Sequence, residues 1–494
     1  MVRSASGSRS LALPRSRRRA AFAIALFGLA ALAGPTCVLG AQALPAGFTY
    51  ETLVDGPLAS ATAMAFAPDG RLFLTERETG NIRVFENGQL RAAPWATVAV
   101  TNHGSWSEAG LLGIAVDPDF LNNHYLYVFH TINNENVIAR LQEVAGQGAN
   151  YTVLTPPGAI SAIPYHNSGP LVFGWDGTLY AQTGDSFSTT APQDLQSWNG
   201  KVLRFEVPNL TVPANNPFPG NPVYSLGHRN GFGLSIHPVT GELFQTENGG
   251  ALMDEVNRIV PGGNYGWPQV EGQEITPDPS LVDPLAWYQP TTALTGGAFY
   301  DGQNYPAQYQ YNWFFTDYNF NHLRAMTLDS TGQNVLGDTL FHDQPGAGYG
   351  VAMGPDGNLW YLTNDGGGYG ADEIGRYVHS NEPMPSVHMM STSQRAIGGS
   401  VTIGVHAHNG DLAIAWLSWS RFSSPVPTPI GNQWVPIDAV LPPLLVTADD
   451  RAYLGISVPN NPSVSNQAMF VQAAAFTPAT GLVAPTNPGK TILH

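Results

Sequence analysis

The sequence predicts an all-β protein in which one strand–turn–strand unit is repeated and a second β region follows. Three observations lead to this prediction. The 494 residues include 54 Gly and 40 Pro, with 11% aromatic and only 12% charged residues, a composition that favours short strands joined by tight turns. No long stretch shows helical periodicity. One phrase with the pattern of a β-hairpin recurs along most of the chain.

Each copy of this phrase begins with an apolar-x-apolar strand and continues through Pro-Asp-Gly or a related turn into a second, alternating strand. The Asp-Gly pair supplies the positive φ that a tight hairpin requires. Five clear copies and one looser copy are present: MAFAPDGRLFLTE from Met64, GIAVDPDFLNNHYLYVFHT from Gly113, LVFGWDGTLYAQTGD from Leu171, LSIHPVTGELFQTEN from Leu234, VAMGPDGNLWYLTND from Val351, and the looser GGAFYDGQNYPAQYQYNWFFTD from Gly296.

Six copies at a spacing of about 50 to 65 residues fit the four-stranded blades of a six-bladed β-propeller. The alternative is a sandwich with irregularly spaced hairpins, because Asp-Gly turns occur in many β proteins, and the regular repetition favours the propeller. The phrase fades after Arg376, and the following strands alternate as in a sandwich around a Pro-rich passage. The predicted domains are therefore a six-bladed β-propeller over 44–380 and a C-terminal β-sandwich-like domain of unknown role over 382–494.

The segment 1–43 is predicted to be a secretory signal peptide. Four arginines precede the apolar run AAFAIALFGLAALAG, which is shorter than the roughly 20 residues of a spanning helix. The triplet Ala41, Gln42, Ala43 offers a small-x-small cleavage site before Leu44. We therefore expect a periplasmic or secreted protein without a membrane span. Cys37, the sole cysteine of the chain, lies in this segment, so the mature protein would have neither a disulfide nor a thiolate metal site.

The charge balance excludes some classes of partner. The chain carries 21 Lys and Arg against 37 Asp and Glu, a net charge of −16. Six of the basic residues and none of the acidic ones lie in 1–43, so the mature balance is 15 minus 37, or −22. Such an acidic chain does not bind nucleic acid or an anionic membrane by charge, although it can hold cations.

Several runs, in their shared order and spacing, resemble the glucose/sorbosone dehydrogenase family of soluble six-bladed sugar dehydrogenases. The resemblance covers about Phe48 to Tyr377 and implies an enzyme that oxidises the C1 hydroxyl of aldoses. It also implies the cofactors pyrroloquinoline quinone (PQQ) and calcium, a small-molecule sugar substrate and a periplasmic or extracellular electron acceptor. The runs are SEAGLLGIAVDPDF, HNSGPLVFGWDGTLYAQTGD, GKVLRFEVP with NNPFPGNPVYSLGHRNGFGLSIHP, and TENGGALMDEVNRIVPGGNYGWP.

Two short runs, HNSG from His166 and GHRN from Gly227, come just ahead of successive copies of the phrase. Loops on one face of a propeller converge on its axis, so we expect these runs to meet there. Removal of hydride from a sugar carbon requires a base for the hydroxyl proton. The resemblance implies that His166 is this base, that Asp185 orients it, and that Arg229 contacts the cofactor and stabilises developing charge. Without the resemblance, His166 would be interpreted as a polar histidine in a turn, Asp185 as an acid that caps a turn at a strand end, and Arg229 as a partner in an ion pair between blades.

The resemblance also implies ligands for the cofactor and for calcium, an ion that takes six to eight oxygen ligands. Each of these positions is compatible with an ordinary loop or turn as well. The implied cofactor contacts are Arg229, Asn230 and Glu108, and the implied calcium positions are the backbone at Gly249 and Gly250 and, in a second region, Glu255 and Tyr265.

The chain departs from the family at three cations that pair with the carboxylates of PQQ. Relatives carry one lysine and two arginines where this sequence has approximately Asn319, Gly348 and Gly350. His322 or Arg324 could supply part of the missing charge. Because each unpaired buried carboxylate costs several kcal/mol, we expect weak or altered PQQ binding.

Two other functions stay open at this point. One is a non-catalytic propeller that binds a glycan or a protein partner, which the missing cations favour and the retained His166, Asp185 and Arg229 oppose. The other is a calcium-dependent lactonase-like hydrolase on a similar ring. That reaction needs several Glu, Asp and Asn side chains around one metal, and no clear set of this kind stands out in the sequence.

Overall fold

A computed structural model describes most of the chain from residue 44 onwards as β-strands. Helical segments in the described part are limited to α1 (Phe120–Asn123) and two short 3-10 turns, η1 (Ala191–Gln193) and η2 (Ala307–Tyr309). The prediction of an all-β protein is confirmed. The described residues are 44–494 without 57, 105–106, 274–277, 303, 344, 365–369, 381–387, 391–399, 407–410, 419–425, 429–430, 434–436, 438, 447–450, 458–467, 479–481, 486–488 and 493–494.

Six antiparallel sheets, counted within the described residues, follow one another along the chain as blades. Blade 1 contains β2 (Ala61–Phe66), β3 (Leu72–Glu76), β4 (Asn81–Glu86), β5 (Gln89–Leu90) and β6 (Ala96–Thr97). Blade 2 contains β7 (Leu111–Val116), β8 (Tyr125–Ile132), β9 (Glu135–Val144) and β10 (Gln147–Val153). Blade 3 contains β11 (Ser168–Phe173), β12 (Leu179–Thr183), β13 (Lys201–Phe205) and β14 (Val223–Leu226).

The remaining blades have the same order of strands. Blade 4 contains β15 (Gly231–Ile236), β16 (Leu243–Glu247), β17 (Asp254–Ile259) and β18 (Ala286–Tyr288). Blade 5 contains β19 (Leu294–Phe299), β20 (Trp313–Asp317), β21 (His322–Leu328) and β22 (Val335–Asp343). Blade 6 contains β23 (Ala347–Met353), β24 (Leu359–Asn364), β25 (Glu373–His379) and, as its outer strand, β1 (Phe48–Asp55).

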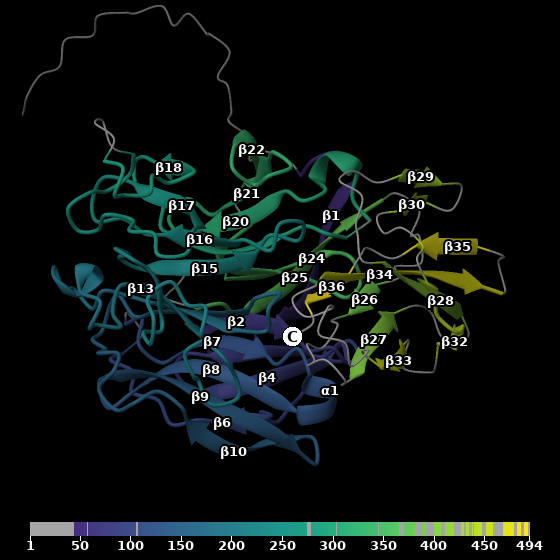
Figure 1. Cartoon of the computed structure of the whole chain (residues 1–494), viewed down its shortest axis with the longest axis horizontal. Coiled ribbons are helices and arrows are strands. Elements are labelled where there is room, and N and C mark those ends of the chain that lie inside the picture. The colour runs from purple at the N-terminus through teal and green to yellow at the C-terminus, as the bar shows by residue number, and fades with distance from the viewer. Residues whose placement is uncertain are drawn as a thin grey trace, which may run out of the picture. The chain divides into compact units, whose positions relative to one another are not determined.

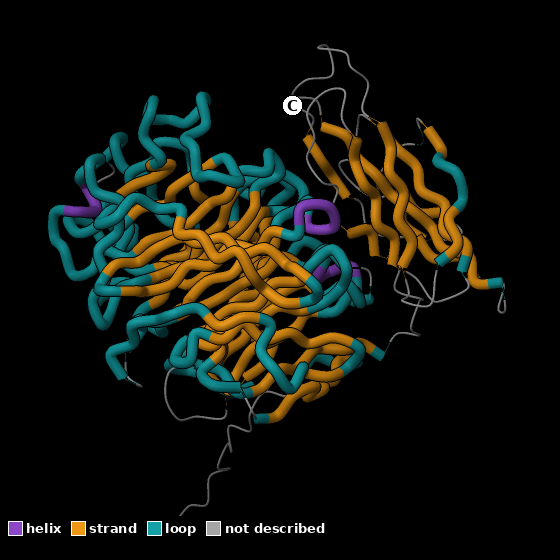
Figure 2. Tube along the Cα trace, turned by 90° about the horizontal axis from the view of Figure 1, so that it is seen from below, coloured by secondary structure: helices purple, strands orange, loops and turns teal. Residues whose placement is uncertain are grey.

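Strand β1, from the start of the described chain, closes the ring by completing the last blade. It pairs antiparallel with β25, so that Phe48 lies opposite His379 and Asp55 opposite Glu373. The first strands of neighbouring blades contact one another from β2 through β7, β11, β15, β19 and β23 and back to β2. The described blades therefore form a closed six-bladed β-propeller (Figures 1 and 2). The repeats predicted the six hairpins, but not which segment completes the sixth sheet.

Every innermost strand has a β-bulge near its beginning. The pairing register shifts at 61/63, 111/113, 168/171, 231/233, 294/297 and 348/350 in the six blades. A bulge leaves a residue unpaired and redirects its side chain. The unpaired residues include Thr62, Leu112, Phe232 and Tyr349, one from each of four blades. The same irregularity in all six blades therefore redirects side chains at the same end of the ring.

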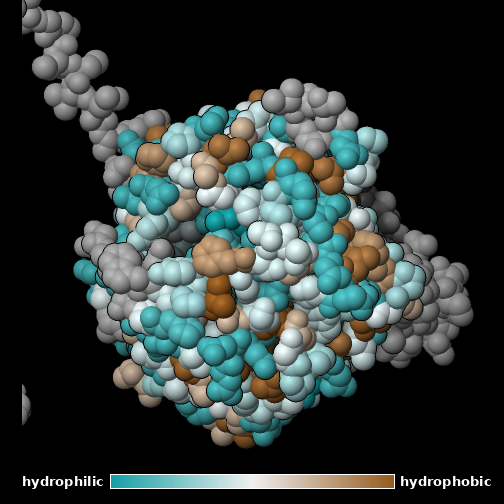
Figure 3. All heavy atoms as spheres, turned by 90° about the vertical axis from the view of Figure 1, so that its left-hand side faces the viewer, coloured by the Kyte–Doolittle hydropathy of each residue, from teal (hydrophilic) through white to brown (hydrophobic). Residues whose placement is uncertain are grey.

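The hydrophobic core lies between facing sheets of neighbouring blades. Phe73 of blade 1 packs with Leu126 and Val128 of blade 2, and Phe244 of blade 4 packs with the fully buried Trp313 of blade 5. Burial of each large side chain contributes about 1.5 to 3 kcal/mol, so these contacts hold adjacent blades in a fixed relation. On the face seen in Figure 3, hydrophobic side chains form small scattered patches among hydrophilic ones.

The described strands beyond residue 380 pair only with one another. The C-terminal β-sandwich and both domain boundaries stay predictions, and the predicted signal peptide lies outside the described residues. No described helix has the length and apolar character needed to cross a membrane. The three C-terminal sheets contain β26 (His388–Met390), β27 (Ser400–His406) and β33 (Arg451–Ser457); β28 (Leu412–Ser418), β31 (Ala439–Val440), β32 (Leu444–Leu445), β34 (Ala468–Thr477), β35 (Leu482–Pro485) and β36 (Gly489–Ile492); and β29 (Val426–Thr428) with β30 (Gly431–Gln433).

Candidate active site

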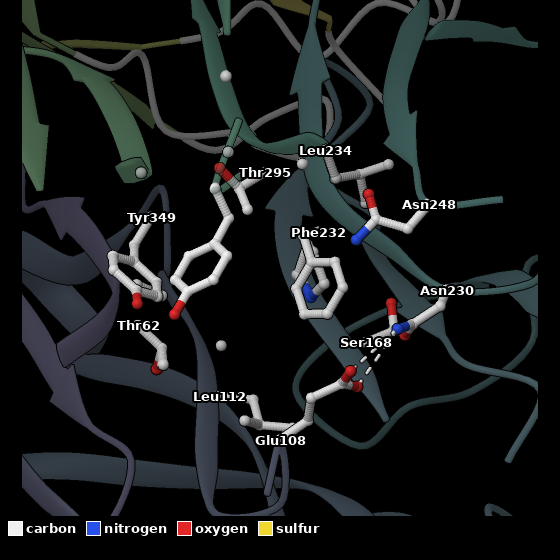
Figure 4. Close-up of a pocket in the computed structure, with 18 of the residues that line it drawn as sticks. Thr62, Glu108, Leu112, Ser168, Asn230, Phe232, Leu234, Asn248, Thr295 and Tyr349 are labelled. Atoms are coloured by element: carbon white, nitrogen blue, oxygen red, sulfur yellow. Dashed lines mark hydrogen bonds between the residues drawn. The ribbon is translucent and has the colours of Figure 1, made fainter. Parts of the chain in front are cut away.

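A cavity of about 340 Å³ lies where the six bulges converge. Its wall takes residues from the innermost strand of every blade, and this volume lies at the lower end of the range for small-molecule sites. Polar groups share the wall with aromatic rings and aliphatic side chains, a mixture that can orient a polar organic ligand. Figure 4 shows the bulge residues that line it: Thr62, Leu112, Phe232, Thr295 and Tyr349.

The three residues predicted to be catalytic contact one another. His166 precedes β11 and Asp185 follows β12, and Nδ1 of His166 lies 2.7 Å from Oδ1 of Asp185. On the other side of the imidazole, Nη2 of Arg229 lies 3.0 Å from Nε2. A guanidinium group can only donate, so Nε2 is the acceptor and the ring proton lies on Nδ1, where it is donated to Asp185. His166 and Arg229 both line the cavity.

Three donors hold the carboxylate of Asp185, which is only 2% exposed. Nδ1 of His166 and the backbone N–H of Phe187, at 2.8 Å, share Oδ1, and Nε1 of Trp267 donates to Oδ2 at 2.9 Å. Such a set of donors suits an ionised carboxylate. The backbone N–H of Asp185 donates to the carbonyl of Arg229 at 2.8 Å, which links blade 3 to blade 4 beside the cavity.

The backbone around His166 lies in the left-handed region, with φ of 57° at His166 and 59° at Ser168, and Phe187 has φ of 57°. Such angles are uncommon for residues other than glycine and gather at functional sites. Oε2 of Glu108 stabilises this conformation by accepting the N–H groups of His166 at 2.6 Å and Asn167 at 3.3 Å. The ring of Phe187 packs against the imidazole, with 3.9 Å between centroids. The position of the His166 imidazole is therefore fixed from two sides.

Glu108 also lines the cavity. Besides the two backbone N–H groups, its Oε2 accepts from Nδ2 of Asn230 at 3.2 Å. Burial raises the pKa of Glu108 above its ordinary value, although His166 and the N–H donors act in the opposite direction. These contacts show Glu108 positioning the HNSG run, and its direct contact with a cofactor stays a prediction.

Arg229 and Asn230 bring unused hydrogen-bonding atoms to the cavity wall. Nη1 of Arg229 donates to the carbonyl of Asn248 at 2.9 Å. In this part of the described wall, Nε of Arg229 and the Oδ1 atoms of Asn230 and Asn248 are buried without a hydrogen-bond partner. An unpaired buried polar atom costs about 1 to 3 kcal/mol. The wall therefore fits a ligand that carries both acceptors and donors.

Cations are scarce in the cavity wall. Asn319 and Gly350, two of the three positions where the family resemblance implies a cation, do line the cavity, but neither supplies a charge. Arg324 donates to Asp338 at 2.8 Å and is not part of the described wall. His322 lies 3.3 Å from Asp317. Neither side chain takes the place of the missing cations in the described wall.

Arg77 is a cavity residue that the sequence did not predict. It follows the first copy of the phrase directly, and that position is the only signal for it in the sequence. Its Nη1 donates to the carbonyl of Ser107 at 2.6 Å and its Nη2 to Glu78 at 2.7 Å. Burial lowers the pKa of Arg77. Because Glu78 already partners this guanidinium, Arg77 adds less positive potential to the cavity than an arginine without an acidic neighbour would.

The predicted calcium loop directly follows Asn248, whose carbonyl binds Arg229. The N–H of Gly249 donates to Asp254 at 2.9 Å, and a Cβ at Gly249 would lie 1.6 Å from the carbonyl oxygen of Met253. Glycine is therefore required there. Among the described residues, the carbonyl oxygens of Gly249 and Gly250 accept no hydrogen bond, so they fit the oxygen donors that calcium takes.

Glu255 and Tyr265, predicted near a second calcium, lie outside the described cavity wall. Glu255 lies opposite Glu247 in the pairing of β16 with β17, and burial together with the charge of Glu247 raises the pKa of Glu255 to about 7. The Tyr265 hydroxyl donates to the carbonyl of Arg258 at 2.5 Å. Within the described ranges, no group of three or more His, Cys, Asp and Glu side chains is arranged to hold a metal. Their calcium roles stay predictions.

The fold and the cavity define a class of protein, a six-bladed propeller with a histidine–carboxylate pair and an arginine at its axial site. The family model described as glucose/sorbosone dehydrogenase matches residues 58–371. The chain belongs to this family, as the resemblance predicted, and its relatives support an oxidoreductase.

Three relatives illustrate the similarity. Quinoprotein glucose dehydrogenase B of Acinetobacter calcoaceticus is 34% identical over 244 residues, which are 42% of this chain and 50% of that protein. The aldose sugar dehydrogenase YliI of Escherichia coli is 26% identical over 354 residues, 66% of this chain and 92% of that protein. The structure of the PQQ-bound form of the aldose sugar dehydrogenase of Streptomyces coelicolor matches with a TM-score of 0.58 and 30% identity, over 68% of this chain and 99% of that one.

Proposed function

We propose that this protein is an exported dehydrogenase that oxidises the C1 hydroxyl of an aldose with PQQ and calcium. The observation that carries the proposal is the contact of His166 with Asp185 on one side and with Arg229 on the other, at the wall of the axial cavity. The family membership supports the oxidoreductase class. A small-molecule sugar is the substrate, and a periplasmic or extracellular acceptor receives the electrons.

In the proposed reaction His166 accepts the proton of the sugar hydroxyl at Nε2. The structure favours this role because Nε2 is unprotonated while Nδ1 donates to Asp185. Asp185 then stabilises the positive imidazolium that forms. In this structure Nη2 of Arg229 contacts Nε2 at 3.0 Å, so the sugar hydroxyl must replace or share this contact. The guanidinium N–H that is then released can stabilise negative charge that develops on the reacting groups.

When bound, PQQ would supply the electrophilic carbon for the hydride of C1, while the hydroxyl proton goes to His166, so that the sugar loses two electrons and two protons in total. Arg229 and Asn230 are the residues of this chain that would hold it, and the carbonyls of Gly249 and Gly250 would hold calcium. The unpaired Nε of Arg229 and Oδ1 of Asn230 support this assignment. Since the wall lacks the three cations of relatives, the proposal includes weak binding of PQQ.

The test is direct titration of PQQ into purified protein with and without calcium, followed by dye reduction across a panel of aldoses. The matched variant is His166→Asn, which keeps a polar side chain but removes the base. Saturable PQQ binding and turnover that falls at least 100-fold in His166→Asn would support the proposal. Binding with unchanged turnover in the variant would reject His166 as the base.

A failure of PQQ to bind at any calcium concentration would reject the dehydrogenase. It would leave the non-catalytic binding of a glycan or protein partner, which the scarcity of cations in the cavity wall favours. The lactonase-like alternative gains no support, because the described residues contain no acidic cluster of the kind that reaction needs.

A further inference from the structure

Trp267, in the NYGWP run between β17 and β18, contacts two members of the axial site that lie on different blades. Its indole Nε1 donates to Oδ2 of Asp185 at 2.9 Å. The guanidinium carbon of Arg229 lies 5.3 Å from the centre of its ring, which is within the range of a cation–π interaction. One side chain from blade 4 therefore touches both partners of His166.

The contact with Asp185 controls the direction of the carboxylate. Oδ1 of Asp185 is already shared by Nδ1 of His166 and the N–H of Phe187. A donor on the opposite oxygen fixes the rotation of the carboxylate plane, because a group held at both oxygens cannot turn away from the imidazole. Hydrogen bonds to charged groups are stronger than those between neutral groups, so this bond selects one orientation of the carboxylate.

The contact with Arg229 acts on the other side of the imidazole. The indole ring holds the guanidinium by its face, while Nη1 is bound to the carbonyl of Asn248 at 2.9 Å. Arginine N–H groups so restrained keep Nη2 directed at Nε2 of His166. With Asp185 held at Nδ1 and Arg229 held at Nε2, the imidazole of His166 keeps the tautomer with its proton on Nδ1.

We propose that Trp267 is a positioning residue that couples Asp185 to Arg229 and so keeps Nε2 of His166 ready to accept a proton. The assignment of an acceptor role to Nε2 rests on the proposed dehydrogenase function. The coupling itself is a property of the protein without cofactor, and it can be measured without turnover.

The informative variant is Trp267→Phe, which removes the indole N–H and keeps an aromatic face. Trp360→Phe is a matched control, because Nε1 of Trp360 donates to Asp356 at the same distance of 2.9 Å and Trp360 is not part of the described cavity wall. Each variant loses one indole–carboxylate hydrogen bond, so both are expected to lose comparable thermal stability. Only Trp267→Phe is expected to affect the axial site.

The first readout is independent of PQQ. Long-range ¹H–¹⁵N correlation spectra of histidine-labelled protein report which imidazole nitrogen carries the proton, and His166→Asn identifies the signals of His166. The wild type and Trp360→Phe are expected to show His166 with its proton on Nδ1. Trp267→Phe is expected to show a mixture of tautomers. Identical His166 signals in Trp267→Phe and the wild type would overturn the proposal.

The second readout uses the enzyme loaded with PQQ. Trp267→Phe is expected to lower kcat about 10-fold, the kinetic equivalent of one lost hydrogen bond to a charged group, and to shift the acid limb of the pH–rate profile. KM is expected to change less than 3-fold, because the indole positions His166 and does not contact the sugar. Equal kcat and pH profiles in both variants would contradict the proposal. If neither the wild type nor the variants turn over, the proposed dehydrogenase function fails. The positioning role of Trp267 is then decided by the tautomer measurement alone.

Discussion

His166 and His228 each bind a carboxylate 19 residues further along the chain, yet only His166 reaches the axial cavity. Nδ1 of His166 lies 2.7 Å from Asp185, and Nδ1 of His228 lies 2.8 Å from Glu247. The two histidines differ at Nε2. Nε2 of His166 faces Arg229 in the cavity wall. Nε2 of the fully buried His228 lies 2.8 Å from the hydroxyl of Ser225. The nitrogen that does not face the carboxylate therefore sets the two pairs apart, since one lies at the cavity wall and the other is enclosed in the core.

This contrast predicts opposite effects for two equivalent substitutions. His166→Asn is expected to remove at least 99% of aldose oxidation with little change in melting temperature, because its imidazole is the proposed base. His228→Asn is expected to keep most turnover per folded molecule and to lose about 1 to 3 kcal/mol of stability, because it removes a buried hydrogen bond to Glu247. Dye reduction and thermal unfolding of both variants check this. Equal loss of turnover in the two would contradict it.

Gly348 and Gly350 of blade 6 stand at two of the positions where the family resemblance implies a cation, and the space around each decides whether an arginine can be introduced there. A Cβ at Gly350 would meet its nearest atoms at 3.8 and 3.9 Å, and Gly350 lines the cavity. Gly350→Arg is therefore expected to tighten PQQ binding about 10-fold, because one charge-assisted pair adds about 1.5 kcal/mol or more. Calorimetric titration measures the change, and Gly350→Met is the control for added volume. A gain of the same size in the Met variant would show that charge is not the cause.

Gly348 gives the opposite prediction for the same substitution. A Cβ there would lie 2.0 Å from Oγ1 of Thr316 and 2.3 Å from the hydroxyl of Tyr361. Gly348→Arg is expected to destabilise blade 6 by several kcal/mol and to lower the yield of soluble protein. Circular dichroism and thermal unfolding check this, and a stable Gly348→Arg variant would show that the strands at this bulge move apart readily.

The stability of the protein is expected to fall between pH 4.5 and pH 7 through Glu255. Its folded-state pKa of about 7 lies above the ordinary value of 4.5, so the folded protein binds this proton more tightly than the unfolded chain. The stabilising effect is complete below pH 4.5 and is lost as the pH rises through 7. Glu255→Gln, which stays neutral, is expected to remove this loss, on the order of 3 kcal/mol at pH 8. Thermal unfolding of both proteins at pH 5 and pH 8 tests it, and a parallel pH dependence would refute it.

Calcium is expected to raise the melting temperature of the wild type. Saturation at about 100 times the dissociation constant stabilises a protein by about 2.7 kcal/mol, and EDTA should reverse the effect. If Glu255 is a ligand, Glu255→Gln loses part of the calcium response, whereas a site formed only by the carbonyls of Gly249 and Gly250 keeps it. No response to calcium in either protein would exclude both proposed sites.

Much of the architecture could be predicted from the sequence because the repeats are local. A hairpin depends on the residues of its own turn and on the alternation of apolar and polar residues in its own strands. The copies beginning at Met64 and Leu171 therefore predict β2–β3 and β11–β12 directly. The pairing of β1 with β25 could not be predicted in this way. It joins segments more than 300 residues apart, and no local pattern specifies which distant edge a strand completes.

The candidate site shows the same division. His166, Asp185 and Arg229 could be singled out from short runs, and the structure brings them together. Trp267 was part of a run noted in the sequence, but its contact with Asp185 depends on how blade 4 packs beside blade 3. The occupied guanidinium of Arg77 also depends on loop packing, which no motif encodes.

The sequence by itself determined an all-β chain with six repeated hairpins, membership of a dehydrogenase family, and a histidine and an arginine placed ahead of neighbouring blades. Only the tertiary structure decided which atoms face one another. The bulges turn Thr62, Phe232 and Tyr349 into one cavity, and Arg229 fixes the acceptor nitrogen of His166. Strand pattern and turns follow from neighbouring residues, whereas the direction of a side chain at a bulge and the partner it meets follow from the closure of the ring.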